Sequence, residues 1–387
     1  MKWFSIISFG FALSLVSCSG SLDSGKVLSQ TQTLQEDRYP PPIDPQDPNT
    51  ALWSVAYGVG GSSSLHYWGI PTEQHASIEA GLKRKYTVGA TFDQSGTLWT
   101  VDQQTLTILG FKSGVLKPGL DAVPDIVLSA PNGTLDHPRD LAFDRQGNLY
   151  VANAYKDNIL RFEAKSLTKS GVVVPTLTIE STQVYSKKYA PYSISIPNQP
   201  NALAFDEKGD LWVGDARSNL LRYSIAEIDK MVARGAVTMK NPPEMYHSAR
   251  GSISSLAFDK AGNLWLGLRS NFDRNRTKVY NPLDETGSVV QYSKKDLSSV
   301  GEADISATYT YKYMSPEDLA ITSGNAVVVT NTLPRHDFTT EVFSDHVRGV
   351  SLPSGKRALP DSETSARVGA MSTALWPIPK GLPLKYW

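Results

Sequence analysis

Apolar and polar residues follow one repeated frame through the middle of the chain. Residues 141–153 read LAFDRQGNLYVAN, an apolar run, Asp-x-x-Gly and an apolar-aromatic run, and residues 203–215 and 256–268 are close copies. In such a frame the Asp side chain caps a turn, and the Gly supplies a positive φ. The flanking runs have the aliphatic and aromatic composition of buried strands. Each copy therefore predicts a β-hairpin.

Two weaker copies extend the series in both directions. Residues 89–102 keep the whole frame, whereas residues 319–331 lose the Asp but keep both apolar runs. The copies recur at intervals of 51 to 63 residues, which indicates a repeat architecture. The equivalent positions are Phe92, Phe143, Phe205, Phe258 and Ile321.

Further strands are expected between the hairpins. A third strand is predicted over 158–167, 219–228 and 287–297, and a fourth over 174–180 and 305–313. Units of four strands are typical of β-propeller blades, so the sequence predicts an all-β propeller.

The two ends of the folded region complement each other. Residues 51–58, 63–70 and 75–82 have the character of second, third and fourth strands, with no first strand before them. Residues 365–376 could supply that first strand, which would close the ring and leave no exposed sheet edge. We therefore expect one domain over 51–387, a six-bladed propeller of four-stranded blades with one blade shared between both termini. Five or seven blades are the lesser alternatives.

The N-terminus has the pattern of a secretory signal. Residues 1–17 contain a basic Lys2 followed by a mostly apolar run that is too short to span a bilayer. The ending Leu-Val-Ser-Cys resembles the lipobox of bacterial lipoproteins, which implies cleavage before Cys18 and lipidation of that residue. The alternative is an ordinary signal peptide that happens to contain a cysteine. We expect a lipid anchor in the bacterial cell envelope, at the outer membrane with the protein facing the periplasm or the cell surface.

Composition bears on the N-terminal segment, on disulfides and on the kinds of binding partner. Residues 18–50 are rich in Ser, Gln, Thr, Asp and Pro and lack an apolar period, so they predict a flexible tether. Cys18 is the only cysteine, so no intrachain disulfide can form. Lys plus Arg and Asp plus Glu both number 38, a balance that gives no electrostatic footprint for nucleic acid. We expect a monomer.

Two copies resemble a known repeat family. Residues 138–153 and 200–215 resemble the NHL repeat, and they are also similar to hairpins of the gluconolactonase and senescence-marker superfamily. The similarity extends in pieces over about 89–335. It implies a propeller but not one function, because such propellers include protein-binding scaffolds, lyases and metal-dependent lactonases.

Hairpin geometry places a candidate ligand site at one mouth of the channel. The start of the first strand and the end of the second lie at the same end of a hairpin, and both positions are mostly polar here. Pockets at such mouths are common ligand sites. The alternative for each residue is a local hydrogen bond to the backbone. The candidates are Asp102, Arg139, Asp140, Asn153, Asn201, Asp215, Arg269, Glu317, Asp318 and Asn331.

Two functions follow from this ring. The first is a tethered, non-catalytic propeller without a cofactor that binds a protein, peptide or glycan at the mouth. The second is a calcium-dependent lactonase-like hydrolase or lyase, which the superfamily resemblance implies, with Asn201 and Glu317 as metal ligands. Arg139 and Ser254 stand where that superfamily pattern has carboxylate or amide ligands, so they break it. The sequence assigns no residue a catalytic role.

Overall fold

The structure is a computed structural model that describes most of the repeat region. The described residues are 31–33, 50–58, 63–68, 75–78, 87–112, 123–185, 193–247, 252–269, 287–298, 307–310, 316–321, 327–333, 344–350 and 368–377. The predicted signal peptide and Cys18 lie outside them. In this part of the chain no helix is long and apolar enough to cross a membrane.

Antiparallel sheets built from consecutive strands make up the fold. The first comprises β5 (Thr87–Phe92), β6 (Leu98–Asp102), β7 (Thr107–Phe111) and β8 (Ile126–Ser129). The second comprises β9 (Pro138–Phe143), β10 (Leu149–Asn153), β11 (Asn158–Phe162) and β13 (Leu177–Ile179). The third comprises β16 (Pro200–Phe205), β17 (Leu211–Asp215), β18 (Asn219–Tyr223) and β20 (Glu244–His247).

The remaining sheets follow the same plan. One comprises β21 (Ser252–Phe258), β22 (Leu264–Arg269), β23 (Ser288–Tyr292) and β24 (Ala307–Thr310). Another comprises β25 (Pro316–Ile321), β26 (Val327–Leu333) and β27 (Ser344–Val350). The last joins β28 (Val368–Pro377) to β2 (Thr50–Gly58), β3 (Ser63–Trp68) and β4 (His75–Ile78), and a separate hairpin pairs β14 (Thr182–Tyr185) with β15 (Ser193–Ile196).

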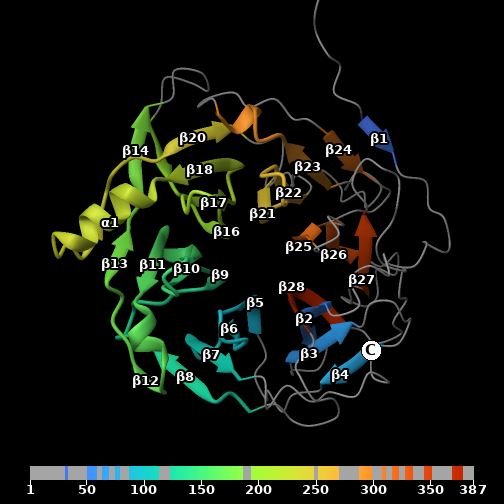
Figure 1. Ribbon diagram of the computed structural model, residues 1–387, viewed down its shortest axis with the longest axis horizontal. Coiled ribbons are helices and arrows are strands. Elements are labelled where there is room, and N and C mark those ends of the chain that lie inside the picture. Colours follow the sequence, from blue (N-terminus) through green and yellow to red (C-terminus); the bar gives the residue numbers. More distant parts are fainter. Residues whose placement is uncertain are drawn as a thin grey trace, which may run out of the picture.

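The sheets are arranged around a centre, so the fold is an all-β propeller (Figure 1). The innermost strands contact one another in the cyclic order β5, β9, β16, β21, β25 and β28, and β28 contacts β5 again. The pairing of β28 with β2 confirms the expectation that the C-terminal stretch supplies the missing first strand beside residues 51–58. The two ends of the repeat region therefore meet in one sheet.

The predicted third strands are too long. β11, β18 and β23 end at Phe162, Tyr223 and Tyr292, and each is followed by a helical segment. The longest of these is α1 (Ile225–Ala233), which lies at the periphery of the ring (Figure 1). Its Ile228 is buried against the core, and Ala, Glu, Lys and Met favour helix over strand once the sheet partner ends.

Aromatic side chains pack each sheet onto the next. Trp99 meets Phe143 edge-on at a centroid distance of 6.1 Å, and Trp212 meets Phe258 in the same way at 5.8 Å. Tyr150 occupies the same slot on β10 and meets Phe205. The regular aromatic position on the second strand therefore packs neighbouring sheets together.

Short parallel strands cover several outer edges. β12 (Gly171–Val172) pairs with β8, and β19 (Thr238–Met239) pairs with β13, each reaching back from the following sheet. β1 (Thr31–Thr33) pairs with β24 in the same orientation. This last pairing was not expected, because residues 18–50 were predicted to form a flexible tether. The unpaired edge of a sheet offers backbone N–H and C=O groups with which an extended segment can pair whatever its side chains are. Residues 31–33 therefore belong to the sheet.

Candidate ligand site at the channel mouth

A register break occurs at the same place in the innermost strands. On β9 the pairing passes from Pro138 to Asp140, so Arg139 has no partner across the hairpin. The same step leaves Asn201, Ser254 and Glu317 unopposed on β16, β21 and β25. A β-bulge re-aims the side chain of its extra residue. The repeats thus present a variable residue toward the channel from equivalent backbone positions.

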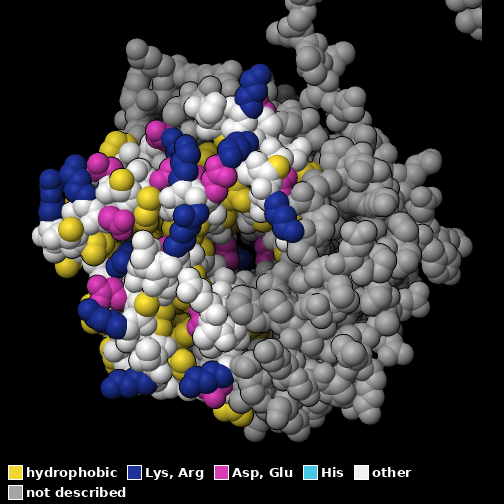
Figure 2. Space-filling model, in the orientation of Figure 1, with side chains coloured by type: hydrophobic (Ala, Val, Ile, Leu, Met, Phe, Trp, Pro, Cys, Tyr) yellow, Lys and Arg dark blue, Asp and Glu magenta, His cyan; other side chains and the backbone are white. Residues whose placement is uncertain are grey.

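These bulge residues line a common cavity. Figure 2 shows an opening at the centre of the ring, with acidic and basic side chains inside it. The cavity there holds about 20 Å³, which is room for one ordered water. Sequence reasoning placed most of its lining at the mouth, and the structure brings those residues together. The lining is Val88, Arg139, Asp140, Asn201, Ser254, Arg269, Glu317 and Asp318.

The cavity holds two arginines and one paired glutamate. Glu317 forms an ion pair with Arg269, whose side chain is 31% exposed. Burial lowers the pKa of Arg139, and the nearby charge of Arg269 lowers it further, whereas Glu317 acts in the opposite direction. The Nε atoms of Arg139 and Arg269 are both buried without a hydrogen-bond partner. The site therefore contains donor capacity that the described residues do not satisfy.

Other lining residues connect adjacent innermost strands. The carboxylate of Asp140 accepts hydrogen bonds from the backbone N–H of Leu141 and from that of Leu203 on β16, both at 2.8 Å. Asn201 donates to the Ile253 carbonyl on β21 at 3.2 Å. Asp318 accepts from the Leu319 N–H as Asp140 does from Leu141. These side chains hold the ring together as well as facing the cavity.

Burial raises the pKa of Asp140 to about 7, although the two backbone N–H donors oppose the rise. The folded protein thus keeps this proton to a higher pH than the unfolded chain does. The resulting stabilisation is fully present below the unfolded pKa and is lost as the pH rises through about 7. Replacing Asp140 with Asn should remove that dependence. Urea unfolding from pH 4 to 8 should show the variant gaining stability relative to wild type as the pH rises; a constant difference would contradict the pKa shift.

Of the polar residues that end the second strands, Arg269 lines the cavity, whereas Asp102, Asn153 and Asp215 are not among its lining residues. The carboxylate of Asp102 accepts from the backbone N–H of Gln104, and Asp215 accepts from those of Arg217 and Asn219. Asn153 accepts from the Asp136 N–H in the same manner. All three side chains are fully buried and bond to nearby backbone, which was the alternative that the sequence left open for each residue. Asn331 pairs through its backbone with Pro316, and its side chain lies outside the described part.

A stacked aromatic pair beside the mouth was missed from the sequence. The rings of His137 and Tyr155 lie 4.1 Å apart between centroids and 5° from parallel. Tyr155 is 57% exposed, and its segment, Ala154–Lys156, contacts β9, the strand that carries Arg139. Burial lowers the pKa of His137, with Arg139 adding to the effect and Asp136 opposing it. His137 lies before the repeated frame and Tyr155 after it, and in both places the copies share no sequence pattern.

The donor set does not fit the calcium site implied by the superfamily resemblance. Of the two expected ligands, Glu317 is paired with Arg269, and Asn201 turns its amide N–H₂ toward β21. Two guanidinium groups in the same cavity oppose a divalent cation. Among the described residues, no group of three or more His, Cys, Asp or Glu side chains is placed to hold a metal ion.

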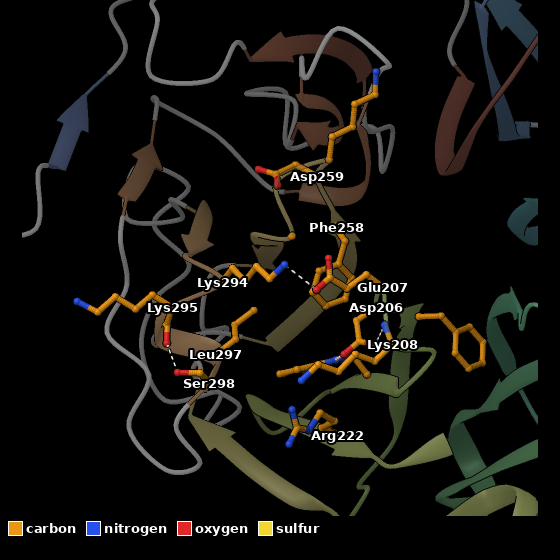
Figure 3. Close-up of a pocket in the computed structure, with 14 residues that line it drawn as sticks. Asp206, Glu207, Lys208, Arg222, Phe258, Asp259, Lys294, Lys295, Leu297 and Ser298 are labelled. Atoms are coloured by element: carbon orange, nitrogen blue, oxygen red, sulfur yellow. Dashed lines mark hydrogen bonds and ion pairs between the residues drawn. The ribbon is translucent and has the colours of Figure 1, made fainter. Parts of the chain in front are cut away.

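A wider hollow lies at the opposite end of the hairpins, between the sheets of β16 and β21 (Figure 3). Its volume is about 890 Å³, and an ion pair of 2.6 Å between Lys294 and Glu207 crosses it. Its carboxylates Asp206 and Asp259 are occupied by the turns, where each accepts from a Trp indole N–H. This hollow is therefore mainly a junction between sheets.

Comparison with known proteins supports the fold alone. No protein-family profile and no curated protein matches the sequence. The chain is similar to a protein of unknown function from Bacteroides caccae (12% identity, TM-score 0.51), over 86% of this chain and 100% of that one. A chain of a nidogen/laminin complex has the same identity and TM-score, over 84% and 98%. Virginiamycin B lyase from Staphylococcus aureus matches at 12% identity and a TM-score of 0.39, over 76% and 71%.

Proposed function

We propose that the chain is a six-bladed propeller that binds a protein, peptide or glycan without catalysis at the bulge-lined mouth. The supporting observation is the cavity to which β9, β16, β21 and β25 each contribute the extra residue of a bulge. The side chains at these positions vary while the backbone geometry repeats, which is how a scaffold carries a specific site.

The proposal includes the place of action. A lipid on Cys18 and a tether between it and β1 would hold the propeller at the membrane of a bacterial envelope, where extracytoplasmic ligands are available. The calcium-dependent alternative would require Glu317 to leave Arg269 and a cation to approach Arg139. No contact in the described cavity favours that rearrangement.

The binding proposal predicts a difference between the two faces of the ring. Wild-type protein and a Tyr155→Ala variant should be applied to arrays of peptides and glycans, with Lys208→Ala on the hairpin-turn face as the control. We expect the bound set to weaken by about tenfold or more in Tyr155→Ala, because an exposed aromatic at a mouth is a typical hot spot. Equal binding by all three proteins would contradict the proposal.

A further inference from the structure

Arg139 is a cation to which the described residues offer no acceptor. It contacts the cavity from the bulge of β9, yet no hydrogen bond or ion pair joins its guanidinium to another described residue. Its Nε is buried, so water does not reach that donor. Leaving a charged donor unsatisfied costs stability, which a sequence tolerates where the group serves a ligand.

The neighbouring acidic groups are already committed. Glu317 pairs with Arg269, and both oxygens of Asp140 accept backbone N–H groups from β9 and β16. Asp318 likewise accepts from its own strand. The cavity therefore contains three carboxylates, but Arg139 is paired with none of them, and Arg269 also keeps an unsatisfied Nε.

We propose that Arg139 and Arg269 bind the carboxylate of an acidic side chain, or of a chain terminus, from a peptide or protein ligand. This inference rests on the proposed function and names the group that the mouth recognises. Guanidinium donors match the two oxygens of a carboxylate, and Glu317 shows that Arg269 already bonds to one in this geometry.

The dimensions of the cavity favour a side chain over a sugar. With room for only about one water, the cavity can be approached by a carboxylate only from its mouth, which suits a carboxylate on a slim methylene stem better than the ring-bound carboxylate of a uronic acid. The stacked rings of His137 and Tyr155 would then lie against the ligand's backbone or neighbouring side chain, outside the cavity.

The test uses the full chain and matched probes. The peptides acetyl-Gly-Glu-Gly-amide and acetyl-Gly-Gln-Gly-amide differ only at the end of the central side chain, which is a carboxylate in one and a neutral amide in the other. Methyl glucuronoside and inorganic phosphate are tested in the same way. The Nε–Hε signal of Arg139, assigned from its loss in Arg139→Gln, should shift saturably with the Glu peptide alone. Affinity should fall by about tenfold or more in Arg139→Gln. Arg217→Gln removes the same charge on the same face and should bind as wild type does.

Thermal melting keeps the test independent of a folding failure. Because Arg139 has no hydrogen-bond or ion-pair partner among the described residues, Arg139→Gln should melt at or above the wild-type temperature, and a clear decrease would overturn the proposal. Equal shifts with the Gln peptide, or a response only to glucuronoside or to phosphate, would also overturn it. If the peptide test fails but Tyr155→Ala still weakens binding on the arrays, the proposed carboxylate recognition is wrong, and the channel mouth remains the binding site.

Discussion

Alanine at Gly214 should destabilise the propeller by about 3 kcal/mol. Gly214 lies on β17, where an added Cβ would be only 2.8 Å from the Cβ of Ile253 on the next innermost strand. That neighbour is fixed to the backbone of β21, so it cannot rotate away, and the two sheets would have to separate. Urea unfolding of wild type and Gly214→Ala measures the loss.

The equivalent position on β10 provides the comparison. Ala152 already has a methyl group there and is fully buried, so the junction that follows β10 accepts a Cβ that the junction between β17 and β21 does not. The change Gly214→Ala/Ile253→Ala keeps the Ile253 Cβ but removes its Cγ2, which also lies too close to the added methyl group, so the double change should be less damaging than the sum of the single ones. Strict additivity would show that the Ile253 side chain beyond Cβ is not part of the obstacle.

Alanine at Asp259 should cost about 3 kcal/mol for a different reason. The Asp259 carboxylate accepts from the backbone N–H groups of Ala261 and Asn263 and from the indole N–H of Trp265 at 3.1 Å. Trp265 is fully buried, so removal of this acceptor breaks a hydrogen bond of a buried indole N–H. Urea unfolding should show the loss.

A second substitution separates the turn from the indole. Trp265→Phe removes the donor, so Asp259→Ala should cost at least about 1 kcal/mol less in that background than in wild type. An unchanged cost would mean that Asp259 acts only through the turn. Asp206 and Trp212 repeat the arrangement and should behave alike.

Much of the fold could be predicted because the repeated sequence marks where each strand and turn begins and ends. The Asp-x-x-Gly turns fix hairpin register, so strand starts could be aligned across copies, and Arg139, Asn201 and Glu317 were found in this way. The bulge itself leaves no local signature beyond a residue that varies among the copies.

The errors have a shared cause in local chemistry. The sequence pattern around an Asp at the end of a strand does not distinguish one that caps a turn, as Asp215 does, from one that faces a channel, as Asp140 does. Only the position of the neighbouring strand distinguishes them, because Asp140 reaches Leu203 across sheets. Tyr155 lies in a connection that has no counterpart in the other copies, so no alignment could locate it beside Arg139.

Cross-linking from within the protein locates the bound ligand directly. A photoreactive amino acid should be placed at position 155 of the full chain or, as a control, at position 208 on the opposite face. Each protein is then irradiated with a ligand that the arrays identify. We predict cross-links from position 155 that excess unlabelled ligand removes, and none from position 208. Cross-linking from position 208 alone would contradict a binding site at the channel mouth.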